Sequence, residues 1–193
     1  MRLIFSVAAA VVFLGGCGSK TDSAGDAGAQ GGWTVDKSAS RLEFSGTQIT
    51  KAFTGSFSDF NASIDFDPDD LDAARIEVVV ATGSARTGDR QRDAALPTKD
   101  WFAVSAFPEA TFVADDIVTL GEDRYEAHGV LTIRDASRPL ALPFSLAIDG
   151  DKAVAEGETT LVRTDFGVGQ GDFTTDEWVG LDVRVAFHIE ATR

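Results

Sequence analysis

The C-terminal end of the chain carries the pattern that most constrains the fold. Apolar residues occupy every second position there: Leu181, Val183, Val185, Phe187 and Ile189. Only Ala186 interrupts the polar residues between them. Successive side chains of a β-strand point to opposite faces of a sheet, so this alternation predicts a strand with one apolar face.

The same alternation recurs at residues 125–133 and 140–148. The second of these segments ends at Asp149-Gly150, a strong hairpin signal, so the next strand should begin near Ala153. Near the start of the chain the apolar positions change parity between Phe57 and Phe60, which predicts a bulge or bend near Ser58-Asp59. The pattern indicates about eight mostly antiparallel strands, arranged as a barrel or a sandwich.

Residues 87–108 break the strand pattern. DRQRDAAL favours one or two helical turns, and Pro97 interrupts them. We therefore expect a short helical excursion across an opening between strands.

The first residues resemble a targeting signal. Arg2 precedes an apolar run at residues 4–14 that is too short to span a bilayer core of roughly 30 Å. Leu14-Gly15-Gly16-Cys17 resembles the lipobox of bacterial lipoproteins and contains the only cysteine. We expect a signal peptide at residues 1–16, a flexible tether at 17–32 that is lipid-anchored through Cys17, and a folded domain at 33–193.

The charge of the chain restricts its partners. The 17 basic residues against 31 acidic ones give a net charge of −14. Such a surface repels phosphate backbones, which excludes nucleic acid as an expected partner.

Two nucleotide-binding motifs overlap near residue 167. Asp165-Phe166-Gly167 matches the magnesium tripeptide of protein kinases, and Gly167, Gly169 and Gly171 resemble a phosphate loop. The other kinase motifs and the strand–turn–helix setting of a dinucleotide site are missing. The glycines are therefore interpreted as a tight loop over the end of the barrel. Arg163 and Asp165 could pair with each other or touch a ligand, and we expect the pairing.

Catalytic and metal-binding patterns are weak. His128 and His188 both occupy the polar positions of their strands, which predicts outward imidazoles on a solvated face. FDPDDLD at residues 66–72 lacks the glycine and closing glutamate of a calcium loop and is interpreted as an acidic turn. We expect neither a catalytic residue nor a metal site.

A basic group at Arg86, Arg90 and Arg92 has two interpretations. It could grip an anionic head group at the mouth of a pocket. Local pairing with Asp89 and Asp93, which alternate with these arginines, is the favoured alternative.

Phenylalanine dominates the aromatic content. All but two of the 14 Phe lie in the domain, against a single Tyr. Phe has bulk without a polar group, which suits either a plain core or a pocket for an apolar ligand.

Ordered motifs along the domain resemble the YceI-like family. They are Trp33-x-Val35-Asp36, Ser40-x-Leu42-x-Phe44, Gly55-x-Phe57-x-x-Phe60, Thr87-Gly88, Arg92-Asp93-x-x-Leu96, Asp100-Trp101-Phe102, Phe107-Pro108-x-Ala110-Thr111-Phe112, Gly129-x-Leu131-Thr132-Ile133-Arg134, Pro139-Leu140 and Arg163-x-Asp165-Phe166-Gly167. Trp101 departs from the smaller or phenyl side chain usual in the family, and Asp135-Ala136 replaces a glycine-containing turn.

The resemblance implies an all-β, antiparallel lipocalin-like barrel with a hydrophobic tunnel that holds an isoprenoid chain. The leading hypothesis is a lipid-anchored protein that binds an isoprenoid lipid, such as a quinone. We expect no cofactor other than this bound lipid. A solidly packed structural or stress-related envelope protein and a lipid-modifying enzyme are the alternatives. Gly18 follows the expected anchor in place of aspartate, which favours the periplasmic face of an outer membrane. Oligomerisation is left open.

The side chains expected to line the tunnel are mostly phenylalanines and aliphatic residues of the alternating strands. They are Phe44, Phe53, Phe57, Phe112, Leu131, Phe144, Phe166, Leu181 and Val183.

Overall fold

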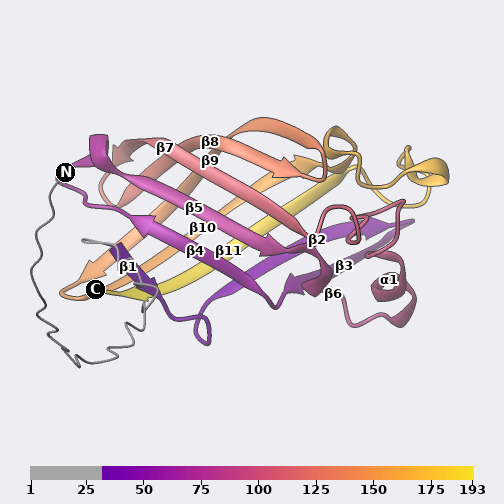
Figure 1. The fold of residues 1–193 in the computed structure, drawn as a ribbon, viewed down its shortest axis with the longest axis horizontal. Helices are drawn as coiled ribbons and strands as arrows, with labels where there is room; N and C mark the ends of the chain where they lie inside the picture. The colour runs from indigo at the N-terminus through magenta and orange to yellow at the C-terminus, as the bar shows by residue number, and fades with distance from the viewer. Residues whose placement is uncertain (1–31) are drawn as a thin grey trace, which may run out of the picture.

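The computed structural model describes residues 32–193, which form a single antiparallel sheet that closes on itself (Figure 1). The predicted signal peptide, the anchor at Cys17 and all of the tether but Gly32 lie outside the described residues. Within residues 32–193, no helix has both the length and the apolar character to cross a membrane.

Strands make up most of the domain. They are β1 (Gly32–Val35), β2 (Arg41–Gln48), β3 (Lys51–Phe57), β4 (Phe60–Asp65), β5 (Arg75–Ala81), β6 (Ala85–Arg86), β7 (Glu109–Gly121), β8 (Arg124–Ile133), β9 (Ala136–Asp149), β10 (Lys152–Val162) and β11 (Asp182–Thr192). The helical segments are α1 (Arg90–Ala95) and the 3-10 turns η1 (Leu71–Ala73), η2 (Thr82–Ser84), η3 (Arg163–Phe166) and η4 (Gly171–Phe173).

The strands close an eight-stranded barrel because three of its strands are interrupted. Both β1 and β2 pair with β11, while β4 pairs with β1 and β3 pairs with β2. In the same way β5 pairs with β4 and β6 pairs with β3, so β1 with β2, β3 with β4, and β5 with β6 are the three interrupted strands. The ring then runs through β7, β8, β9 and β10 back to β11. This architecture confirms the predicted antiparallel barrel, and the predicted break at Ser58-Asp59 separates β3 from β4.

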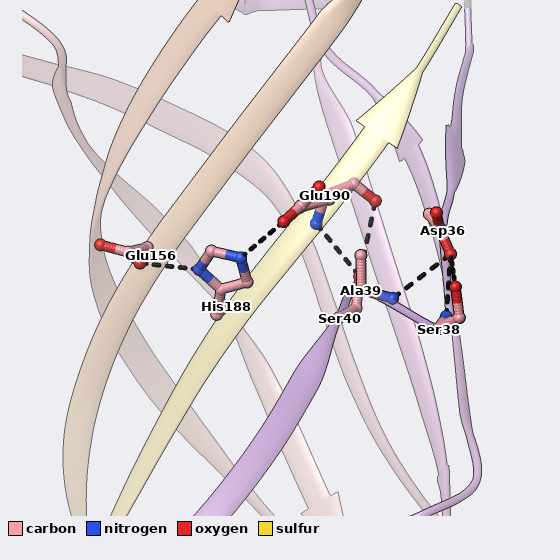
Figure 2. Close-up of polar contacts among 7 residues, drawn as sticks. All are labelled: Asp36, Ser38, Ala39, Ser40, Glu156, His188 and Glu190. Atoms are coloured by element: carbon pink, nitrogen blue, oxygen red, sulfur yellow. Dashed lines mark hydrogen bonds and ion pairs between the residues drawn. The ribbon is translucent and has the colours of Figure 1, made fainter.

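The interruption between β1 and β2 is held by polar contacts (Figure 2). The Asp36 carboxylate accepts hydrogen bonds from Ser38 N at 2.8 Å, Ser38 Oγ at 2.6 Å and Ala39 N at 3.3 Å. These hydrogen bonds lower the pKa of Asp36, and the bond from the Ser38 hydroxyl has the largest effect. Ser40 Oγ accepts a hydrogen bond from Glu190 N at 3.0 Å, which fixes the start of β2 to β11.

The two ends of the barrel differ (Figure 1). At one end lie β1 and the C-terminus; at the other, the β2–β3 hairpin, α1 and the loop after β10 gather. Helix α1 confirms the predicted helical turns before Pro97. Its N-terminus is capped by the Asp89 side chain, which accepts from Gln91 N at 2.9 Å and Arg92 N at 3.0 Å.

An aromatic cluster fills the interior at the β1 end. The Phe66 ring packs edge-on against Tyr125 with centroids 5.2 Å apart, and Tyr125 stacks on Phe144 at 5.6 Å. The indole of Trp33 donates a hydrogen bond to the Phe66 carbonyl at 3.0 Å. This packed cluster forms the floor of the barrel and leaves the opposite end for the irregular segments.

Candidate functional site

The interior of the barrel contains a cavity of about 420 Å³. Every phenylalanine of residues 32–193 except Phe107 lines it. Within the described part of the chain, its lining includes no Asp, Glu or Lys. The polar lining residues are Gln48, Thr82, Thr87, Gln91, Arg92, Thr159 and Arg163. The volume falls in the range of roughly 300–1,000 Å³ typical of small-molecule sites.

Most of the side chains predicted to line a tunnel lie in this wall. They are Phe44, Phe53, Phe57, Phe112, Leu131, Phe144, Phe166 and Val183. Leu181 is not among the lining residues. It precedes the first residue of β11, Asp182, so the alternation that turns Val183 inward does not extend to it.

Strand parity and a glycine together create the aromatic wall. Phe44 on β2 lies opposite Gly55 on β3, where an added Cβ would collide with the Phe44 ring. The ring therefore lies across the neighbouring strand and meets Phe57, with centroids 5.2 Å apart. Phe57 in turn contacts Phe102 of the loop after α1 at 5.9 Å. The loop thus continues the apolar surface of the strands.

Polar lining residues gather where the β2–β3 hairpin faces α1. Arg92 donates to Gln48 Oε1 at 2.9 Å and to Thr87 Oγ1 at 3.3 Å, and its guanidinium lies 4.9 Å from the centre of the Phe53 ring. Its Nη1 atom is 3.9 Å from the Asp89 carboxylate, so the local pairing predicted for Arg92 is observed. The exposed Gln91 marks this edge as the mouth of the cavity.

Arg163 corrects one expectation. The predicted pair with Asp165 is wrong: Arg163 is 3% exposed, and its side-chain hydrogen bonds go to backbone carbonyls of the loop between β10 and β11. It donates to the carbonyl oxygens of Val168 at 2.9 Å and Val179 at 2.7 Å, and to those of Gly180 and Thr175. Burial lowers the pKa of the Arg163 guanidinium. Arg163 therefore holds the loop between β10 and β11 together.

The glycine-rich loop covers this end of the barrel, as predicted. Gly167, Gly169 and Gly171 all have positive φ, at 64°, 89° and 62°. A Cβ on Gly169 would collide with Arg163 Nη1, so the close approach itself requires glycine. The backbone of the loop bonds to the segment after α1 through the Asp100 carbonyl, which accepts from Gly169 N at 2.8 Å.

Loop residues are the part of the lining that sequence reasoning missed. Val168, Phe173 and Val179 come from irregular backbone without periodicity, so no alternation could assign them to the interior. Trp101, singled out only as a departure from the family pattern, also lines the cavity, and its ring lies 5.2 Å from that of Phe173.

Both histidines lie on the outer face of the barrel, as predicted. His188 contacts Glu156 at 2.7 Å and Glu190 at 3.2 Å (Figure 2). His128 contacts Glu126 at 2.7 Å and Asp116 at 3.1 Å. These carboxylates raise the pKa of each imidazole.

Neither imidazole lines the cavity. Across residues 32–193, no three or more His, Cys, Asp or Glu side chains are grouped so as to hold a metal ion.

Comparison with known proteins agrees with this geometry. A model of the YceI-like domain matches residues 33–191. The chain belongs to the YceI-like family. A UPF0312 protein of Pseudomonas syringae pv. syringae is 29% identical over 135 residues, covering 67% of this chain and 70% of that protein. A UPF0312 protein of Pectobacterium atrosepticum is 30% identical over 146 residues, covering 72% and 73%.

Solved structures share the YceI-like barrel. BcnA of Burkholderia cenocepacia is 28% identical with a TM-score of 0.79, over 82% of this chain and 99% of BcnA. A polyisoprenoid-binding domain of Saccharophagus degradans is 15% identical with a TM-score of 0.68, over 83% and 97%. The barrel closes within residues 32–193 and nearly all of the BcnA chain corresponds to it, so we expect this segment to fold on its own.

Proposed function

We propose that this YceI-like protein binds a long, apolar lipid of the isoprenoid type in the cavity of its barrel, for transport or storage. The observation that carries the proposal is the wall of the cavity, which is built from phenylalanine and aliphatic side chains. Burial of apolar surface contributes about 25 cal/mol per Å², so a long chain needs few polar contacts to bind.

The chemistry of the wall selects against charged ligands. An ionised group placed beside Phe44, Phe112 or Phe144 would lose its hydration without gaining a partner. Polar atoms are available mainly at the mouth, around Gln48, Gln91 and Arg92. A ligand with an apolar chain and one small polar end fits this distribution.

The comparisons support an isoprenoid-type ligand. The Saccharophagus degradans domain with the same fold is described as polyisoprenoid-binding. At 15% identity that likeness concerns the fold, so the argument for this chain depends on its own lining residues.

Two alternatives fit the structure less well. A solidly packed structural barrel would leave no interior space of about 420 Å³. A lipid-modifying enzyme that used His128 or His188 would need an imidazole inside the cavity, and both lie outside it.

For location, we propose that Cys17 carries the lipid anchor of the mature chain and that residues 17–32 tether the barrel to a membrane of the cell envelope. The proposal is supported by the short apolar run at residues 4–14 and by Cys17 being the only cysteine. The glycine at position 18 favours the periplasmic face of the outer membrane.

Ligand binding is tested by titrating residues 32–193 with isoprenoid quinones of increasing chain length. Trp33 and Trp101 line the cavity, so a bound quinone should quench their fluorescence. A Trp178→Phe background removes the exposed indole. We expect saturable quenching at one ligand per chain, with affinity rising by up to about 0.8 kcal/mol per buried CH₂. Absence of saturable quenching at every chain length would contradict the proposal.

A further inference from the structure

Two residues with exposed apolar side chains lie next to each other at the mouth end of the barrel. The exposed fraction is 63% for Ile49, in the β2–β3 turn, and 48% for Trp178, in the loop before β11. Ile49 N donates a hydrogen bond to the Trp178 carbonyl at 2.9 Å, and Gln48 forms a β-bridge with Val179. We call the pair Ile49 and Trp178 the mouth tip.

The backbone of Ile49 is unfavourable for its side chain. Its φ is +59°, in the left-handed region that β-branched residues avoid and that Asn or Gly adopts readily. An exposed isoleucine gains little from folding at such a position. A role outside the folded core accounts for it.

The mouth tip lies next to the cavity. Gln48 and Val179 both line the cavity, and Ile49 and Trp178 are their immediate neighbours in the chain. A shallow depression beside the tip includes Phe53, which also lines the cavity. The mouth tip therefore adjoins the cavity through Gln48, Phe53 and Val179.

The charges around the tip do not favour an anionic surface. Lys51 is exposed beside Ile49, but Asp176 and Glu177 are exposed immediately before Trp178. With a net charge of −14, the chain is repelled by an anionic bilayer. Indole and aliphatic side chains flanked by mixed charges suit a zwitterionic membrane interface.

The chain that precedes the barrel is long enough to allow this contact. It enters at β1, at the opposite end from the mouth (Figure 1). Residues 17–32 can reach at most about 55 Å when extended, whereas a strand as long as β9 spans about 48 Å. An anchor at residue 17 therefore permits the mouth to face the same bilayer.

We propose that the mouth tip docks the barrel, mouth first, on the surface of a zwitterionic bilayer, with Ile49 and Trp178 inserted among the lipid head groups. The inference depends on the proposed function for its purpose: an apolar ligand can then pass between bilayer and cavity without crossing water. A second copy of the chain is a poorer occupant, because two side chains offer far less than the roughly 800 Å² per partner of a stable interface.

The test is cosedimentation of residues 32–193 with phosphatidylcholine vesicles. Ile49→Asn combined with Trp178→Ser should lower the vesicle partition coefficient about tenfold or more. Leu120→Ser combined with Val130→Ser is the matched control, since both residues are 48% exposed and neither lines the cavity. The control variant should partition like the unsubstituted domain. Adding phosphatidylglycerol to the vesicles should weaken the partition of the unsubstituted domain.

Stability separates docking from a structural role. Ile49→Asn should leave the melting temperature equal or higher, because Asn tolerates the left-handed backbone, while partition falls. A lower melting temperature with unchanged partition would overturn the inference. Three other results would also overturn the inference. The tip and control variants could partition equally, or the unsubstituted domain could fail to partition at all. The unsubstituted domain could also form a concentration-dependent dimer that the tip variant loses.

Ligand delivery separates this inference from the proposed function. The tip variant should bind an isoprenoid quinone supplied in dilute detergent as the unsubstituted domain does, but take it up more slowly from vesicles. Equal uptake rates from vesicles would overturn docking. Failure of the unsubstituted domain to bind from detergent would overturn the proposed function, while vesicle partition would still decide docking.

Discussion

Replacing Arg163 with Met should destabilise the domain by about 3 kcal/mol. The bonds from Arg163 to the Val168 and Val179 carbonyls are buried, whereas those to Gly180 and Thr175 are partly exposed. Each buried acceptor left without a donor costs about 1–3 kcal/mol, so the two together cost about 2–6 kcal/mol. Relief from burying the guanidinium charge offsets part of this.

Thermal and urea unfolding of residues 32–193 measure the effect. For a domain of this size, 1 kcal/mol lowers the melting temperature by roughly 2–4 °C, so Arg163→Met should lower it by roughly 6–12 °C. The matched control is Arg184→Met, because Arg184 is 53% exposed and pairs with Glu158 on the outer face. That exposed pair contributes little to stability, so Arg184→Met should lower the melting temperature far less than Arg163→Met.

Asp165→Asn distinguishes the observed contacts from an Arg163–Asp165 ion pair. Asp165 is exposed, and Arg163 instead bonds to backbone carbonyls, so Asp165→Asn should change stability by no more than about 0.5 kcal/mol. A stable Arg163→Met variant, or an Asp165→Asn variant as unstable as Arg163→Met, would refute this account of the loop.

Three further predictions concern the cavity, pH and the anchor. Ala155→Phe should fill part of the cavity and weaken quinone binding at least tenfold by fluorescence titration, whereas Ala147→Phe, on the exposed face, should not. The carboxylates around His128 and His188 raise the pKa of both imidazoles above the unfolded value, so their stabilisation is complete below that value and is lost as pH rises through the folded pKa. Urea unfolding at pH 5 and pH 8.5 should therefore show that replacing both with Gln costs stability only at pH 5; equal losses at both would contradict this. Cys17→Ser should release the full chain from membranes in fractionation, and continued membrane residence would exclude the anchor.

The regular half of the structure could be predicted because its signal is local. Alternation places Val183 and Phe144 on the inner face from their own strands alone, and the parity change after Phe57 locates the break before β4. The barrel followed from the number of such strands together with the family motifs.

The irregular half could not be predicted in the same way. The contacts of Arg163 join it to residues up to 17 positions away in a loop whose path depends on left-handed glycines, so the sequence pointed to the nearest carboxylate, Asp165. The assignment of Leu181 to the cavity lining was wrong because it extended the strand periodicity one residue beyond the start of β11. Phe173 and Val179 also line the cavity, but they were not predicted because loop residues follow no regular alternation.

The most direct test of the central claim is native mass spectrometry of the protein purified gently from the organism that makes it. If the cavity holds an isoprenoid-type lipid, the spectrum should show an added hydrophobic mass that organic extraction removes, and the extract should contain that lipid. A barrel that is uniformly empty, and that takes up no quinone or prenyl lipid when these are supplied, would contradict the account.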